Sequence, residues 1–110
     1  MARRMGIVIG VKPEKVQEYK ELHAAVWPEV LAQIKECGIS NYTIFLREPE
    51  NLLFACWEYS GSDFAADIAK MSAHQPTRRS WEVTGLCQVP LTSRQPGEHW
   101  AIMEEVFHLD

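Results

Sequence analysis

The stretch MGIVIGVKPEKVQEYKELHAAVWPEVLAQIKECG, residues 5–38, decides the fold because it predicts a strand followed by the clearest helix of the chain. Met5 to Val11 is a run rich in β-branched residues that ends at a Lys-Pro pair, which is typical of a strand before a helix start. From Val16 to Ile34, bulky side chains recur every three or four residues, the spacing of one helix face. Gly38 can adopt the left-handed backbone that ends a helix, so we expect a strand–helix unit here.

Pro28 interrupts the predicted helix. Proline has no N–H to donate to the carbonyl of Ala24, and its ring crowds that carbonyl, so a kink or local break is expected. The break would lie just past His23. It is either a tolerated kink or a device that tilts Trp27 and frees backbone polar groups beside a pocket, and the sequence leaves both interpretations open.

The rest of the chain predicts a hairpin, a second helical region and a final strand. Tyr42, Ile44 and Leu46 alternate with polar and aromatic neighbours along the first strand of the hairpin, so they share one face. Asp63 follows a glycine turn and is a good N-cap for a short helix. The expected elements are strands at 39–46, 52–59 and 103–109, helices at 64–71 and 78–83, and a long loop at 90–97.

The element order predicts an α+β fold of the ferredoxin-like βαββαβ type, with helices covering one face of an antiparallel sheet. We expect residues 1–110 to form a single domain, since the chain is too short for two cores. The other sheet face then needs cover. A second copy of the chain can supply it, so we predict a homodimer whose sheets pack face to face.

Composition narrows the class of protein. Apolar residues make up 46% and charged residues 24% of the chain, and the net charge of -4 is spread without a basic stripe, so nucleic acid is not an expected partner. No apolar run approaches the ~20 residues of a membrane span. The three cysteines, Cys37, Cys56 and Cys87, form no CxxC pair, which favours a reducing cytosol, and each is expected to be buried.

Tyr19 and His23 are the candidates for chemistry. Four residues apart on a helix, they share one face. Histidine gives and takes protons near neutrality, and a tyrosine hydroxyl can orient a substrate oxygen, so the pair can transfer protons. The alternative is that both are core packers, which periodic aromatic stripes usually are.

Four tryptophans add a second hint. Trp27, Trp57, Trp81 and Trp100 are many for so short a chain, and flat rings suit the C–H faces of sugars. Trp57, in the middle of a strand, is expected in the core. The chain has no Gly-rich phosphate loop, no GxSxG and no HExxH, and its histidines are not at ligand spacing, so neither a cofactor nor a metal is expected.

These residues resemble a known family. The motifs that carry the resemblance, in chain order, are Glu18-Tyr19, His23, Val26-Trp27-Pro28-Glu29, Gly38, Asn41-Tyr42, Asn51-Leu52-Leu53-Phe54-Ala55 and Glu105-Val106-Phe107. Over nearly the whole chain they are similar to the L-rhamnose mutarotases. The resemblance implies a dimeric α/β barrel and a cofactor-free isomerase that interconverts the α and β anomers of a pyranose.

The resemblance also implies residue roles. His23 matches the proton donor, and Tyr19 and Tyr42 match tyrosines that contact the sugar. Ser80 and Trp81 match a Trp-Trp pair, so a small hydroxyl replaces one sugar-facing ring. Trp27, four residues after His23, is a further candidate for the sugar face.

The leading hypothesis is therefore an aldose mutarotase acting on a 6-deoxy or similar aldopyranose by acid/base ring opening at His23. A non-catalytic sugar-binding or regulatory dimer of the same fold is the main alternative. A cofactor-free oxygenase is a third, by analogy of fold alone.

Overall fold

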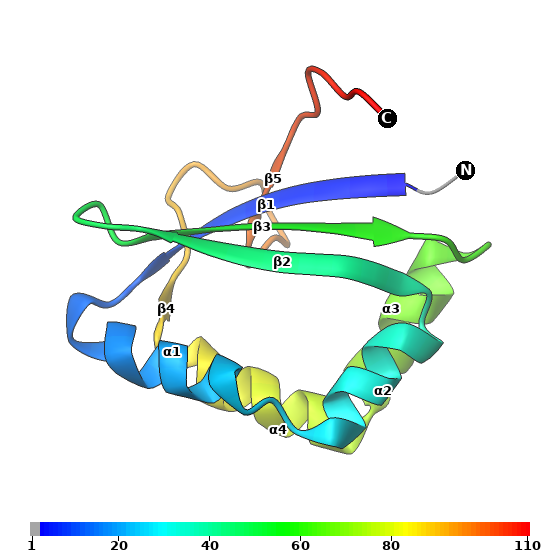
Figure 1. The fold of residues 1–110 in the computed structure, drawn as a ribbon, viewed down its shortest axis with the longest axis horizontal. Helices are drawn as coiled ribbons and strands as arrows, with labels where there is room; N and C mark the ends of the chain where they lie inside the picture. The colour runs from blue at the N-terminus through cyan, green and yellow to red at the C-terminus, as the bar shows by residue number, and fades with distance from the viewer. Residues whose placement is uncertain (1–2) are drawn as a thin grey trace.

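The computed structural model describes residues 3–110 and places the helices on one side of a curled antiparallel sheet (Figure 1). The strands are β1 (Arg3–Val11), β2 (Ile39–Arg47), β3 (Leu52–Tyr59), β4 (Gln88–Val89) and β5 (Ala101–Met103). The helices are α1 (Val16–Ala24), α2 (Pro28–Glu36), α3 (Phe64–Ala73) and α4 (Gln75–Gly85), with a 3-10 turn at Pro13–Lys15 before α1. The strand order is β2-β3-β1-β4, and β5 also pairs with β1. This arrangement confirms the predicted α+β class.

Pro28 breaks the first predicted helix into two. α1 ends at Ala24, and Pro28 is the first residue of α2. The backbone N–H at this position has no acceptor within the helix, so a proline there loses no hydrogen bond. The carbonyl of Trp27 instead accepts from the backbone N–H groups of Val30 and Leu31, at 3.0 and 3.2 Å. The expected break is confirmed, and it separates two helices completely. Gly38 follows α2 with φ +83°, as its predicted role in ending the helix requires.

The second helical region is longer than its sequence pattern indicates. Asp63 caps α3 as predicted, because its Oδ1 accepts from the backbone N–H of Ala66 at 3.1 Å. α4 starts at Gln75, three residues before its expected start, with Pro76 in its first turn. Within residues 3–110, no helix combines the length and the apolar character that crossing a bilayer requires.

The predicted last strand at 103–109 is wrong. Only Ala101–Met103 pairs, alongside Gly6 to Val8 of β1. The apolar residues of the tail continue beyond Met103, but a strand also needs a neighbouring edge, and the tail leaves the sheet on the side away from the helices (Figure 1). Residues 104–110 have no regular structure. The two-residue strand β4, too short to leave a sequence pattern, was not predicted.

The core has two clusters under the sheet, one towards each end. The first consists of Met5, Cys37, Ile39, Trp57, Tyr59 and Met71. The second consists of Ile9, Val11, Tyr19, Leu53 and Cys87, with Trp100 packed against it. Trp57 is therefore a core residue, as predicted. The prediction of buried cysteines is correct for Cys37 and Cys87 and wrong for Cys56, which alternation in β3 places on the other face of the sheet.

The face of the sheet opposite the helices is not covered by a helix in the single chain (Figure 1). Ile44 and Leu46 of β2 pack against the second cluster, as their predicted common face requires. Phe45, between them, points the opposite way and is 61% exposed. Apolar tail residues on the same side are exposed as well, namely Val106, Phe107 and Leu109.

Gly38→Ala is expected to destabilise the protein by about 1–2 kcal/mol, because side chains resist the left-handed backbone. The added Cβ would also lie 3.1 Å from the backbone nitrogen of Gly61. Gly85→Ala is the matched control, since Gly85 ends a helix and nothing lies within 4 Å of an added Cβ. Urea unfolding measures both. Equal effects of the two substitutions would contradict the account of Gly38.

Candidate active site

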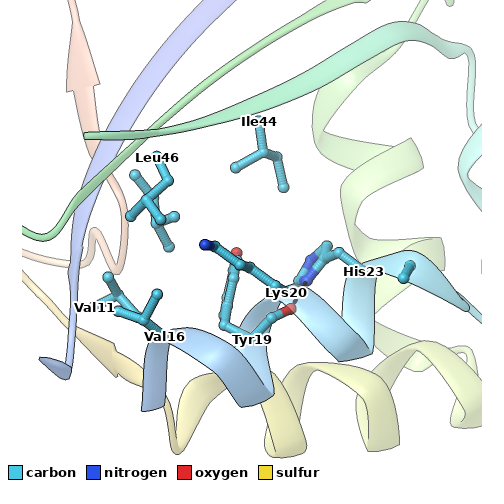
Figure 2. Close-up of a pocket in the computed structure, with 9 residues that line it drawn as sticks. Val11, Val16, Tyr19, Lys20, His23, Ile44 and Leu46 are labelled. Atoms are coloured by element: carbon cyan, nitrogen blue, oxygen red, sulfur yellow. Dashed lines mark hydrogen bonds between the residues drawn. The ribbon is translucent and has the colours of Figure 1, made fainter. Parts of the chain in front are cut away.

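A pocket of about 300 Å³ lies between α1 and the sheet (Figure 2). Tyr19, Lys20 and His23 project into it from α1, so the spacing of Tyr19 and His23 does place both on one face. The rest of the lining is aliphatic and comes from the start of α1, its end and three strands. It consists of Val11, Val16, Ala24, Ile44, Leu46 and Leu53.

The imidazole of His23 is fixed against Tyr19 in two ways. The two rings stack with their centroids 4.2 Å apart. Nδ1 of His23 also lies 2.9 Å from the carbonyl oxygen of Tyr19. A carbonyl can only accept, so Nδ1 carries a hydrogen and donates it. Nε2 is therefore the nitrogen left for a ligand, and it can accept a proton when the ring is neutral and return it when the ring is charged.

Tyr19 stays a neutral hydroxyl near neutral pH. Its side chain is 5% exposed. Burial raises the pKa of Tyr19 to about 12, while a hydrogen bond with Gln88 acts in the opposite direction and the nearby Tyr42 adds to the rise. A neutral phenol can donate a hydrogen bond to a sugar oxygen, and at this pKa it is a poor base.

Tyr42 and Trp27 lie outside the pocket lining. Tyr42, on β2, stacks on Trp57 with ring centroids 6.5 Å apart, and burial raises the pKa of its hydroxyl. Trp27 lines a second hollow of about 280 Å³ together with Glu29, Pro76 and Arg79, where α2 and α4 begin.

Ser80 and Trp81 lie on α4 and line neither hollow. Trp81 is 44% exposed, so much of its indole surface is open to a ligand. Of the residues predicted for the site, only Tyr19 and His23 share one pocket in the structure.

Three residues of this region escaped prediction. The sequence suggests a surface lysine at Lys20, although its position directly after Tyr19 could have indicated that it lies near the pocket. Gln88 lies beside Val11 of the pocket lining only because β4 pairs with β1, and Nε2 of His99 lies 2.8 Å from its Oε1. Neither β4 nor the path of the following loop leaves a pattern in the sequence. Within residues 3–110, no group of three or more His, Cys, Asp or Glu side chains is placed to hold a metal ion.

Comparison with known sequences points to one family. Residues 4–109 match the family model described as L-rhamnose mutarotase. The L-rhamnose mutarotase of Oceanobacillus iheyensis is 32% identical over 98% of this chain and 99% of its own length. That of Flavobacterium johnsoniae is 34% identical over 99% of this chain and 97% of its own length.

Solved structures agree with these matches. The crystal structure of an L-rhamnose mutarotase from Formosa agariphila superposes with a TM-score of 0.76 at 25% identity, over 98% of this chain and 99% of that one. The tetracenomycin F2 cyclase of Streptomyces glaucescens gives a TM-score of 0.73 over 99% of this chain and 98% of its own. At 15% identity, the cyclase shares the fold alone.

The free energy of unfolding is expected to fall in alkali partly because of Tyr19. Its pKa is about 12 in the folded chain, against an ordinary value of 10.0. The neutral hydroxyl therefore stabilises the fold fully below about pH 10, and this stabilisation is lost as the pH rises toward 12. Between about pH 9 and about pH 11, Tyr19→Phe should lose about 1 kcal/mol less stability than the wild type in urea unfolding. Equal losses would show that Tyr19 is not shielded from water in this way.

Proposed function

This chain belongs to the L-rhamnose mutarotase family, and on that premise we propose that it is an aldose mutarotase, an isomerase that interconverts the α and β anomers of L-rhamnose or a related pyranose. The observation that carries the proposal is the family match over residues 4–109, which includes every residue of the pocket. The fixed pair of Tyr19 and His23 within that pocket supplies the chemistry.

His23 is the proposed acid. A charged imidazole gives its Nε2 proton to the ring oxygen, the bond from that oxygen to the anomeric carbon breaks, and the anomeric hydroxyl loses its proton to water or a backbone carbonyl. The product is the open-chain aldehyde. Rotation next to the carbonyl followed by closure on its other face gives the second anomer. The hydroxyl that attacks the carbonyl returns its proton to His23, and the new anomeric oxygen takes back the proton that the base had received. The reaction has no net change of charge or oxidation state.

Tyr19 and the aliphatic walls bind the sugar in this proposal. The neutral Tyr19 hydroxyl donates to a sugar oxygen and holds it beside His23. Ile44, Leu46 and Leu53 form an apolar wall. Such a wall favours the methyl group of a 6-deoxy sugar over a hydroxymethyl group, because burying a hydroxyl without a partner costs free energy. A volume of about 300 Å³ is at the small end for ligand pockets and suits one monosaccharide.

The remaining predicted contacts form the outer part of the proposed site. Tyr42 contacts the sugar from β2, the strand that also supplies Ile44 and Leu46 to the pocket. Trp27 and Trp81, each more than two-fifths exposed at 43% and 44%, offer flat faces to the C–H side of the ring. Ser80 contributes a hydroxyl and leaves more room than a second ring on α4.

We also propose that two copies of the chain pair through their bare sheet faces. Phe45 and the apolar tail residues leave an apolar surface on this side. Burying that surface against a second copy removes it from water, the main favourable term in association. Two curled sheets packed in this way form the dimeric α/β barrel that the resemblance to the family implies.

The single domain over residues 1–110 and the cytosolic location remain predictions. The location rests on three free cysteines, two of them buried, without a disulfide framework.

Anomer exchange measured by NMR saturation transfer tests the proposed activity, with L-rhamnose, L-fucose and D-glucose as substrates. His23→Ala is expected to lower the protein-catalysed rate by about 10²–10⁴-fold, the usual contribution of a positioned acid or base. Gln17→Ala is the control, because Gln17 is exposed on the same helix and outside the pocket lining. The same rate for wild type and His23→Ala with every sugar would refute the role of His23. Tight sugar binding by a wild type that does not accelerate exchange would select the non-catalytic alternative.

Light scattering at micromolar concentration tests the pairing. The wild type should have twice the mass of one chain, and Phe45→Glu should shift it toward the monomer, because a charge would be buried in the interface. Leu86→Glu is the matched control, since Leu86 is 66% exposed at the end of α4, among the helices on the other side of the sheet. A monomeric wild type would overturn the proposal.

A further inference from the structure

Lys20 is a charged side chain of the pocket that the reaction outlined above does not use. It lines the pocket together with Tyr19 and His23, while the other lining residues are aliphatic and none is a carboxylate. Within residues 3–110, no ion pair or side-chain hydrogen bond involves Lys20. Its positive charge therefore faces the pocket without a neutralising partner.

The backbone of α1 directs Lys20 into the pocket. Val16 precedes it by four residues and His23 follows it by three, the spacings that place side chains on one face of a helix. Figure 2 shows the nitrogen of Lys20 pointing into the space between α1 and β2, while the ring of His23 lies farther along α1. A sugar in this pocket would therefore meet the imidazole at one part of its ring and the ammonium at another.

The ammonium group of Lys20 needs hydrogen-bond acceptors. It carries three N–H donors and no acceptor. Lys20 is an exposed residue, so water can satisfy these donors when no ligand is bound. A ligand that fills the pocket displaces part of this water, and the aliphatic walls offer no oxygen in its place. The ligand itself has to supply the acceptors, and a pyranose supplies them as neighbouring hydroxyl groups.

We propose that Lys20 is a sugar-binding residue whose ammonium group donates hydrogen bonds to hydroxyl oxygens of the pyranose. His23 serves the ring oxygen in the proposed reaction, so Lys20 contacts hydroxyl groups that take no part in ring opening. Such contacts are equally strong in the ground state and the transition state, so they lower KM and leave kcat unchanged. Hydrogen bonds to a charged group are stronger than neutral ones, so Lys20 contributes to the choice of sugar. This inference rests on the proposed mutarotase activity.

Lys20→Met tests the role of the charge, because methionine keeps an unbranched apolar side chain and lacks the ammonium. We expect KM for the anomer exchange of L-rhamnose to rise about 10-fold, with kcat changed by less than about 2-fold. His23→Ala should act mainly on kcat. Lys35→Met is the matched control, since Lys35 is exposed on α2 and outside the pocket lining. This control should leave both constants at their wild-type values.

Sugars that lack one hydroxyl group identify the oxygens that Lys20 contacts. L-Rhamnose analogues without the hydroxyl at C2, C3 or C4 are measured as competitors of L-rhamnose exchange, each against the wild type and Lys20→Met. Removing a hydroxyl that accepts from Lys20 should weaken inhibition of the wild type about 10-fold. The same analogue should bind Lys20→Met almost as well as L-rhamnose does, because the partner is already missing. A general change of stability would not produce this coupling.

The outcomes are distinct. An unchanged KM in Lys20→Met, or an equal rise in Lys35→Met, overturns the role of Lys20 and leaves the proposed function standing. The Lys20 side chain would then only cover the apolar wall, with its ammonium in water. A rise in KM without coupling to any of the three hydroxyl groups also contradicts the inference.

A wild type without accelerated exchange overturns the proposed function, and NMR titration with L-rhamnose then decides the role of Lys20 by itself. A Kd about 10-fold higher for Lys20→Met than for the wild type supports the binding role. An equal Kd for the two proteins contradicts it.

Discussion

The missing N–H of Pro28 is the constraint on which the rest of the architecture depends. Because Pro28 cannot continue α1, the chain leaves the helix after Ala24 and starts α2 in a new direction (Figure 1). Tyr19 of α1 then packs in one core cluster, while Cys37, directly after α2, packs in the other. One straight helix does not follow the curl of the sheet in this way. The break thus lets a single segment of chain cover both ends of the sheet, and it leaves His23 in the last turn of α1, at the pocket.

The pocket combines apolar walls with polar groups from about one turn of helix. Tyr19 is buried enough to remain neutral, and His23 uses Nδ1 on a backbone carbonyl, so one hydroxyl and one ring nitrogen are available to a ligand. These are the groups that ring opening of a sugar requires, a hydrogen-bond donor that holds the substrate and a titratable group that moves a proton. Their positions are set by the backbone of α1 and by stacking of the two rings, so neither depends on a mobile loop.

The sequence predicted what local chemistry controls. Helix periodicity placed Tyr19 and His23 on one face, and proline, glycine and aspartate marked the breaks and caps correctly at Pro28, Gly38 and Asp63. It failed where a neighbour decides the outcome. The tail contains apolar residues like a strand but pairs with no neighbouring strand beyond Met103, and β4 is a strand only because β1 lies beside it. For the same reason the pairing of Gln88 with Val11 of the pocket lining was invisible in the sequence, and so was the position of Ser80 and Trp81 outside that lining.

The central claim is that the sugar binds beneath β2, against Tyr19 and His23, with Trp27 at most at its outer edge, and is not held within the second hollow. Isotope-filtered NOE spectra of the labelled protein with L-rhamnose test it most directly. The account predicts contacts from the C6 methyl group of the sugar to the side-chain methyl groups of Ile44 and Leu46, which line the pocket. Contacts confined to Trp27 and Pro76, which line the second hollow, would contradict it.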